Sequence, residues 1–111
     1  HRAASPDPYR DLIAEACMRL AAEPAARTPL PEVCGGLGIS YERFRKVFQQ
    51  QMKMTPGQYR IRSRIDAACA MLTEGHLSLQ QIAAALGYPS VYAFSAQFKS
   101  AMGIPPGSFR R

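Results

Sequence analysis

The two halves of the chain carry the same ordered set of residues, and this internal repeat restricts the fold more than any other feature. Each copy has a glycine turn, a serine, two phenylalanines four positions apart, and a closing proline, aromatic residue and arginine. The matched pairs, 49 residues apart before the additional Pro89 and 50 apart after it, are Cys34 and Ala83, Gly38 and Gly87, Ile39 and Tyr88, Ser40 and Ser90, Phe44 and Phe94, Phe48 and Phe98, Pro56 and Pro106, Tyr59 and Phe109, and Arg60 and Arg110. So many matches in one order predict two similar helical units rather than a stacked solenoid, which needs at least about three repeats.

The segment between the copies predicts one long helix over residues 55–75. Thr55 is a suitable N-cap, Pro56 suits the first helical position, and Gly75 suits the left-handed residue after the last turn. About eighteen residues at about 1.5 Å each give roughly 27 Å. An apolar stripe at spacings of four, three and four is formed by Ile61, Ile65, Ala68 and Leu72. We expect this helix to be a rod that holds the two units apart.

The rest of the chain predicts six further helices and an all-α fold. A first helix should begin at Asp7-Pro8 and end before Pro24, and a second should cover roughly 30–37 although Gly35-Gly36 weakens it. Serine caps predict helices at roughly 41–51, after Ser78, and at roughly 91–101, and Pro105-Pro106 opens a last short turn. The predicted divisions are a linker or cloning scar at 1–7, a first helix-turn-helix unit at 8–54, the connecting helix at 55–75 and a second helix-turn-helix unit at 76–111.

Composition argues against an enzyme, a metal site and a membrane span. No apolar run approaches the roughly 20 residues that cross a bilayer, and no signal peptide is visible. The three cysteines, at positions 17, 34 and 69, form no Cys-x-x-Cys pair, so we interpret them as reduced apolar residues, with a redox or metal role as the alternative. No carboxylate pair, nucleophile–histidine pair or phosphate loop is present, and we expect no cofactor. Because the first residue is not methionine, we expect the chain to be part of a longer protein.

The positive charge is concentrated in the middle of the chain. Residues 1–42 carry a net charge of −2, residues 43–66 carry +6, and residues 67–111 carry +2. Half of the 14 basic residues therefore fall within 24 positions. Such a patch suits a polyanion, with nucleic acid first and an anionic membrane second. The helix around Arg60 to Arg64 lacks the bulky apolar face of a membrane-surface helix.

The third helix of each unit has an apolar face and an outward face. The outward residues of the first are Glu42, Arg45, Lys46 and Gln49, and those of the second are Tyr92, Ser95, Ala96 and Lys99. A short helix, a glycine turn and then an amphipathic helix with a cationic outer face is a helix-turn-helix pattern. The alternatives are a plain helical hairpin with a solvated face and a helical protein-interaction module without DNA binding.

The second unit resembles the DNA-binding domain of the AraC/XylS family of bacterial transcription regulators. The matching residues are Ile82-Ala83, Gly87-Tyr88, Ser90, Phe94-Ser95, Phe98-Lys99, Gly103 and Pro106-x-x-Phe109-Arg110, and the first unit repeats them as Gly38-Ile39-Ser40, Phe44-Arg45-Lys46-Val47-Phe48 and Thr55-Pro56-Gly57-Gln58-Tyr59. The resemblance covers about residues 8–111. It implies seven helices, with helices 41–51 and 91–101 entering successive major-groove segments of double-stranded DNA.

The resemblance also implies which side chains read bases. The positions carried over are Glu42, Arg45 and Lys46 in the first unit and Val91, Tyr92 and Ala96 in the second; the outward-face argument adds Gln49, Ser95 and Lys99. Four departures from the family pattern stand out: Ala96 replaces a basic residue, Gln97 lies where the first copy has Val47, Lys53 replaces a glycine, and Pro29 replaces a common serine cap. We therefore predict an unequal reader, with the first unit providing most of the affinity.

Phosphate contacts are expected from capped helix starts and from basic side chains, namely Ser40, Ser78, Ser90, Arg43, Arg60, Arg62 and Arg64. The resemblance implies a bacterial, cytoplasmic regulator with DNA and RNA polymerase as partners and no membrane partner. We expect this fragment to be monomeric and the full-length protein to be dimeric through a missing N-terminal domain. The operator, the effector and the choice between activation and repression stay open.

Overall fold

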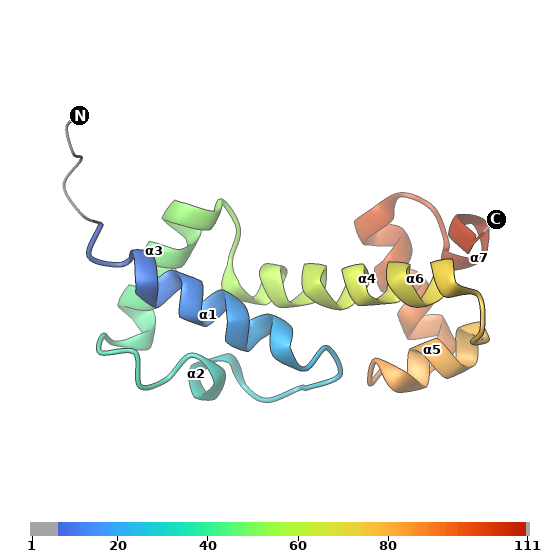
Figure 1. The fold of residues 1–111 in the computed structure, drawn as a ribbon, viewed down its shortest axis with the longest axis horizontal. Coiled ribbons are helices and arrows are strands. Elements are labelled where there is room, and N and C mark those ends of the chain that lie inside the picture. Colours follow the sequence, from blue (N-terminus) through green and yellow to red (C-terminus); the bar gives the residue numbers. More distant parts are fainter. Residues whose placement is uncertain (1–6, 111) are drawn as a thin grey trace.

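Two helical units lie at the ends of one long helix in the computed structural model, which describes residues 7–110 (Figure 1). The described chain measures 49 × 33 × 21 Å along its principal axes. Its seven helices are α1 (Arg10–Ala22), α2 (Leu30–Val33), α3 (Tyr41–Met52), α4 (Pro56–Glu74), α5 (Leu79–Ala85), α6 (Val91–Met102) and α7 (Pro106–Arg110). The all-α class with seven helices is confirmed. The linker predicted at 1–7 lies outside the described residues except for Asp7.

Helix α4 is the unbroken rod that the sequence predicts. Thr55 Oγ1 accepts from the Gln58 amide at 3.1 Å, and Gln58 Oε1 accepts from the Thr55 amide at 2.9 Å, which completes a capping box. At the other end Gly75 adopts φ 77°, and its amide donates to the Met71 carbonyl at 3.3 Å. Nineteen residues give a helix of roughly 28 Å.

Each unit has its own hydrophobic core, and the two cores share no buried residue. The first core is formed by Ile13, Ala16, Leu20, Cys34, Phe44, Val47 and Phe48. The second core is formed by Ile65, Ala68, Leu72, Ile82, Ala83, Leu86, Phe94 and Phe98. Helix α4 therefore supports the second unit through the C-terminal part of its apolar stripe, and the first unit through Tyr59, which packs against the first core.

The repeat in the sequence is also a repeat of aromatic packing. In the first unit Phe48 lies between Phe44 and Tyr59, with ring centroids 5.6 and 5.8 Å away. The second unit places Phe98 between Phe94 and Phe109, at 5.8 and 5.6 Å. The edge-to-face contacts at Tyr59 and Phe109 explain why both copies end with an aromatic residue.

Two predicted helix bounds in the first unit were wrong. Helix α1 begins at Arg10 rather than at Pro8, because Asp7 Oδ1 accepts from the Tyr9 amide at 2.9 Å and its carbonyl from the Arg10 amide at 3.2 Å, forming a turn before the helix. Helix α2 ends at Val33 rather than near 37. Gly36 adopts φ 72°, so the double glycine ends the helix instead of continuing it.

Candidate nucleic-acid interface

Helix α3 presents a polar surface that is anchored by its own apolar face. Ser40 Oγ accepts from the Arg43 amide at 3.1 Å and caps the helix, while Phe44, Val47 and Phe48 are buried beneath it. This register leaves the predicted base-reading residues of the first unit exposed on the other face, namely Glu42, Arg45, Lys46 and Gln49. The face therefore offers a carboxylate, two cations and an amide to a partner.

Helix α6 repeats the arrangement with fewer charges. Ser90 Oγ caps it by accepting from the Ala93 amide at 3.1 Å. Tyr92 is 82% exposed, and Ala96 and Lys99 are also exposed. Ser95 is half-buried, and Val91 is half-buried and packs against the second core, so these two predicted residues are less accessible than the others.

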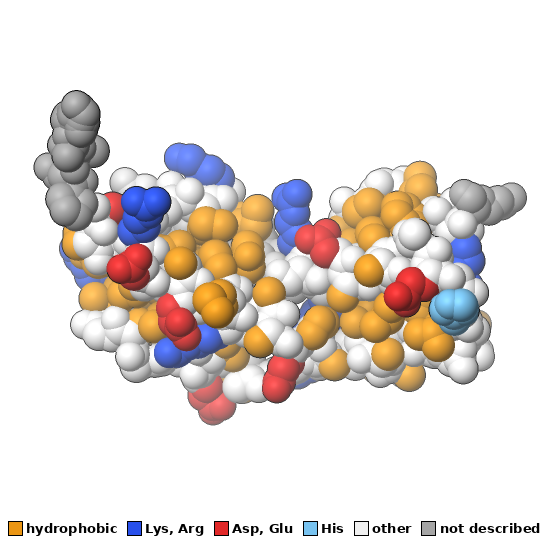
Figure 2. All heavy atoms as spheres, in the orientation of Figure 1, with side chains coloured by type: hydrophobic (Ala, Val, Ile, Leu, Met, Phe, Trp, Pro, Cys, Tyr) orange, Lys and Arg blue, Asp and Glu red, His pale blue; other side chains and the backbone are white. Residues whose placement is uncertain are grey.

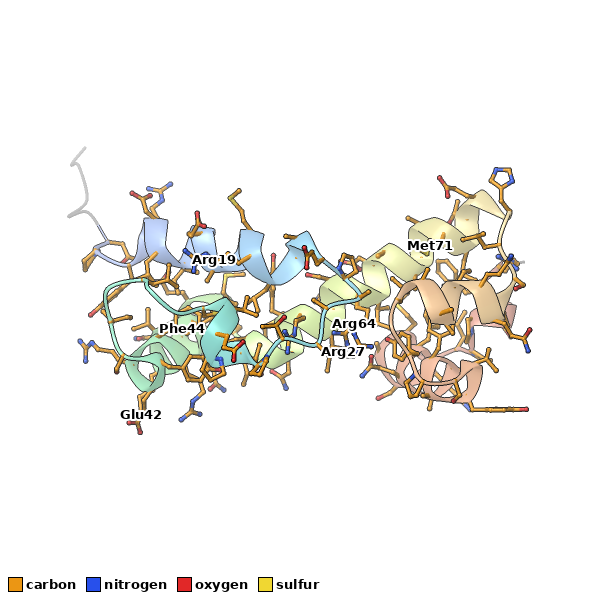
Figure 3. The ribbon with its side chains drawn as sticks, turned by 90° about the horizontal axis from the view of Figure 1, so that it is seen from below. Arg19, Arg27, Glu42, Phe44, Arg64 and Met71 are labelled. Atoms are coloured by element: carbon orange, nitrogen blue, oxygen red, sulfur yellow. The ribbon has the colours of Figure 1, made fainter. Side chains whose placement is uncertain are left out.

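The faces of α3 and α6 lie on one side of the molecule. In Figure 1 α6 passes behind α4, and α3 lies behind α1. The perpendicular view in Figure 3 places both on the side opposite α1, and Glu42 points away from the body of the protein on that side. One extended partner could therefore contact both helices at once.

Arg43 and Arg60 are partly held by contacts with the first unit, while Arg62 extends into solvent. The Arg43 Nε donates to Tyr9 Oη at 3.1 Å, and its guanidinium lies 5.8 Å from the centroid of the Tyr9 ring. Arg60 Nη1 donates to the Thr28 carbonyl at 2.6 Å. Among residues 7–110 the one ion pair joins Arg19 and Glu15 at 3.0 Å, so acidic side chains of that range do not neutralise these arginines.

Arg64 has to be removed from the predicted phosphate-binding set. Its side chain is 5% exposed, its Nε donates to the Pro24 carbonyl at 2.8 Å, and its Nη2 donates to the Ala26 carbonyl at 3.3 Å. Burial lowers the pKa of its guanidinium, and the neighbouring Arg27 adds to that effect. Arg64 therefore holds a loop of the first unit and cannot reach a ligand outside the protein.

The three predicted cap serines all form their caps. Besides Ser40 and Ser90, Ser78 Oγ accepts from the Gln81 amide at 3.1 Å, and Gln81 Oε1 accepts from the Ser78 amide at 2.8 Å. The α3 and α6 helices have 12 residues each, whereas α5 has 7, so α3 and α6 place the larger partial positive charge at their N-termini.

The opposite side of the molecule has a different character. Figure 2 shows hydrophobic, acidic and basic side chains intermixed on the face that α1 covers.

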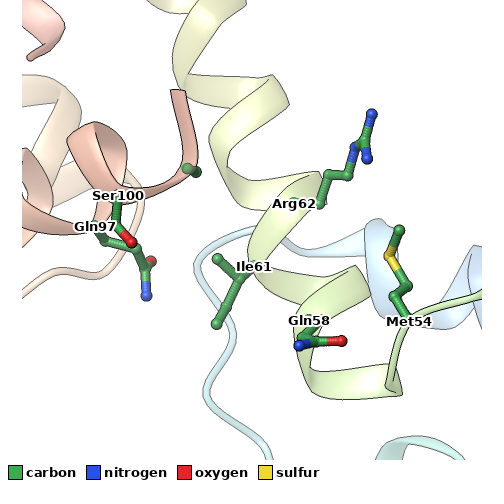
Figure 4. A pocket seen from close by; sticks show the side chains of 7 residues that line it. Met54, Gln58, Ile61, Arg62, Gln97 and Ser100 are labelled. Atoms are coloured by element: carbon green, nitrogen blue, oxygen red, sulfur yellow. The ribbon is translucent and has the colours of Figure 1, made fainter. Parts of the chain in front are cut away.

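A shallow groove opens between α4 and α6, lined by Met54, Gln58, Ile61, Arg62, Gln97, Ser100 and Ala101 (Figure 4). Its lining brings no carboxylate, histidine or cysteine together, so it does not support acid–base or nucleophilic chemistry.

The described residues offer no metal site and no membrane span. Within residues 7–110 no three histidine, cysteine or acidic side chains are grouped closely enough to hold an ion. The same range includes no helix that is both long and apolar enough to cross a bilayer. All three cysteines are unpaired thiols, with Cys34 buried and Cys17 and Cys69 half-buried.

Comparison with known proteins identifies the family. Residues 33–111 match the sequence profile of a family described as a helix-turn-helix domain. The chain belongs to this family, in its AraC-type form. Over 100 residues, or 90% of this chain, it is 31% identical to an AraC-like transcription regulator of Streptomyces lividans. The relatives and solved structures that it matches are described as transcription regulators or as their DNA-binding domains, so the predicted family is confirmed.

Solved structures of transcription regulators have the same fold. A transcriptional regulator with an AraC-type DNA-binding domain from Chromobacterium violaceum superimposes with a TM-score of 0.84 and 23% identity, covering 91% of this chain and 90% of that one. The DNA-binding domain of AdpA, solved in complex with a target DNA, gives a TM-score of 0.72 and 22% identity, covering 95% of this chain and 91% of that one. The chain spans only 33% of the length of the Streptomyces lividans relative.

Proposed function

We propose that this AraC-type domain binds specific sites in double-stranded DNA, with α3 and α6 in successive major-groove segments on one face of the duplex. The observation that supports this proposal is that both helices lie on one side of a single unbroken helix, α4 (Figures 1 and 3). The length of α4, roughly 28 Å, is comparable with one turn of DNA, about 34 Å. Two outward helix faces spaced by a rod of this length suit two groove segments one turn apart.

The exposed side chains of α3 are suited to hydrogen bonds with bases. Arg45 and Lys46 can donate to guanine O6 and N7, Glu42 can accept from cytosine N4, and Gln49 can form two hydrogen bonds with adenine. On α6, Tyr92 and Ala96 suit contact with thymine methyl groups, and Lys99 is the one cation among the outward residues. We therefore assign most of the affinity to the first unit.

Phosphate contacts would come from groups around these faces. Arg43, Arg60 and Arg62 retain donors beyond those bound within the protein, and the N-termini of α3 and α6 at Ser40 and Ser90 favour anions. Ser78 caps the shorter helix α5, and its contact with a phosphate stays a prediction. Such contacts carry no sequence information but make binding depend on salt concentration.

The wider role of the protein follows from this proposal. DNA binding would place it in the bacterial cytoplasm, and regulation of transcription would bring it into contact with RNA polymerase. We expect residues 7–110 to bind as a monomer, since one copy contains both reading helices. In the longer protein, a region outside this chain would supply dimerisation and effector binding.

Selection of bound duplexes from a random pool, repeated at two salt concentrations, tests the proposal. We expect an enriched site with two specified segments whose centres lie about 10 base pairs apart. A double variant, Arg45→Ala with Lys46→Ala, should lose the base preference in one of the two segments. Arg10→Ala, which removes an exposed cation of α1, should keep the base preference in both. Absence of any enriched sequence with the unaltered chain would refute the proposal.

A further inference from the structure

A loop of the first unit touches the second unit, although the two have separate cores. The loop between α1 and α2 runs beside the turn that connects α5 to α6. Arg27, in this loop, donates from Nη2 to the Leu86 carbonyl at 3.2 Å, and its guanidinium lies 5.3 Å from the centroid of the Tyr88 ring. The same side chain donates from Nη1 to the carbonyls of Ala25 and Ala26 at 3.0 and 3.4 Å, which fixes its orientation.

Arg64 contacts the same tyrosine from helix α4. Its guanidinium lies 6.0 Å from the centroid of the Tyr88 ring while it donates to the Pro24 and Ala26 carbonyls of the loop. Figure 3 shows Arg27 and Arg64 close together beside the middle of α4, between the two units. Tyr88 of the second unit is thus flanked by one arginine from the loop and one from the rod.

The contact at Tyr88 continues into the reading helix α6. Tyr88 Oη donates to Gln97 Oε1 at 2.5 Å, and its ring lies 5.3 Å from that of Phe94. The corresponding positions of the first copy hold Ile39 and Val47, which offer no such polar connection. The departure at Gln97 is therefore explained, since its side chain accepts the hydrogen bond of a tyrosine that the first unit lacks.

The backbone at this contact is closely fitted. Gly87 adopts φ 78°, and a Cβ atom built on it would lie 2.7 Å from the Ala25 carbonyl oxygen and 3.3 Å from Arg27 Nη1. A side chain at position 87 would therefore collide with the backbone of the loop. The first copy differs here as well, because Gly38 has no atom within 4 Å of the equivalent position. The close approach is therefore specific to the second unit.

We propose that Arg27 and Arg64, acting on Tyr88 and Gln97, fix the orientation of the second unit relative to the first and so set the base-pair spacing at which α6 meets DNA. Between the two cores the units are connected covalently by α4 alone, so any curvature or twist of this long helix moves α6 relative to α3. The contact with the α1–α2 loop gives the second unit a further attachment point. Arg27, Arg64, Tyr88 and Gln97 are positioning residues in this account, which depends on the DNA-binding function proposed above.

The first test uses Arg27→Ala and a duplex selected by the unaltered chain, together with duplexes that have one base pair added or removed between the two segments. The unaltered chain should bind the parent duplex best. Arg27→Ala should weaken that binding about tenfold, part of the 10²–10⁴ factor available from joining two binding modules, and should reduce the preference for the parent spacing. The control is Arg19→Ala, which removes hydrogen bonds to the Val33 and Gly35 carbonyls inside the first unit and should keep the spacing preference.

The second test needs no DNA. Residual dipolar couplings of the unaltered chain should fit one alignment tensor for both units, and those of Arg27→Ala should require two. If the couplings of Arg27→Ala fit a single alignment tensor and this variant keeps the parent spacing preference, the proposal is overturned. If the unaltered chain selects no duplex, the DNA-binding function fails while the couplings still decide whether Arg27 fixes the second unit. Tyr88→Phe, which removes only the hydroxyl that donates to Gln97, should shift both measurements in the same direction by a smaller amount.

Discussion

Lys53 and Gly103 occupy equivalent positions after α3 and α6, and both adopt the left-handed conformation, with φ 63° and 84°. Their amides donate to the carbonyls of Gln49 and Lys99 at 2.9 and 2.8 Å, so the two helices end in the same way. Lys53 is the one residue other than glycine with a positive φ among the described residues. A side chain in this conformation costs roughly 1–2 kcal/mol relative to the right-handed one, a cost that glycine avoids.

Lys53→Gly should therefore stabilise the first unit. We expect the free energy of unfolding to rise by about 0.5–1 kcal/mol, because removing the positive charge at the C-terminus of α3 offsets part of the conformational gain. Urea denaturation measures the change. Gly103→Ala is the reciprocal variant: no atom lies within 4 Å of its added Cβ, so it should cost about 1 kcal/mol through conformation alone. A destabilised Lys53→Gly variant would contradict this explanation.

Arg45→Ala should weaken DNA binding by about 1–3 kcal/mol and relax the preference at one base pair. Its side chain is exposed on α3, so the free energy of unfolding should change little. Ala96→Arg should strengthen binding by adding a cation to the outward face of α6. Titration of a selected duplex against each variant provides the comparison. If Tyr92→Ala weakened binding far more than Arg45→Ala combined with Lys46→Ala, the unequal roles of the two units would be disproved.

Arg62 and Arg64, two positions apart on α4, should give opposite results on replacement by alanine. Arg62 is exposed, and Arg62→Ala should reduce the slope of log affinity against log salt by about 1 without changing stability. Arg64→Ala leaves the half-buried Pro24 carbonyl without its donor and the Ala26 carbonyl with only the 3.4 Å bond from Arg27, at a total cost of about 1–3 kcal/mol. Salt titrations and denaturation curves for both variants separate the two roles. Equal salt slopes for Arg62→Ala and the unaltered chain would remove Arg62 from the interface.

Stability should decrease in alkaline solution because of a buried thiol and a half-buried phenol group. Burial raises the pKa of Cys34 above its ordinary value of 9.0, and burial also raises the pKa of Tyr88, against the opposing charge of Arg64. The folded protein keeps these protons at pH values where the unfolded chain has lost them. The stabilisation is therefore complete below about pH 8 and declines as pH rises through about 9 and beyond. Denaturation at several pH values should show this decline, and Cys34→Ala should make it shallower; an unchanged slope would exclude Cys34 as a cause.

Local sequence signals were sufficient to predict the fold. Thr55, Ser78 and Ser90 cap the helices they were expected to cap, and Gly75 ends α4 where predicted. These signals work because capping and left-handed glycines depend on neighbouring residues alone. The double glycine at 35–36 was harder to interpret. Glycine is tolerated inside a helix at a cost of about 1 kcal/mol, and it is also common just after a helix ends.

Side-chain direction on α4 was less easily predicted. Arg64 was grouped with Arg60 and Arg62 by charge, although it follows Ile61 by three positions and precedes Ala68 by four, which places it on the apolar stripe. That spacing was the available signal for its burial. The partners of Arg27 could not be predicted in the same way, because they lie about 60 residues away and depend on how the two units pack.

Because the cores of the two units have no buried residue in common, the halves of this domain can change separately. A substitution that alters the outward surface of α6 leaves the hydrophobic support of α3 untouched, and the reverse also holds. Duplication followed by independent variation would thus let one ancestral reader become two with different base preferences. Engineering could follow the same route, by exchanging residues 65–110, which hold the whole second core, between relatives that keep the contact with Arg27.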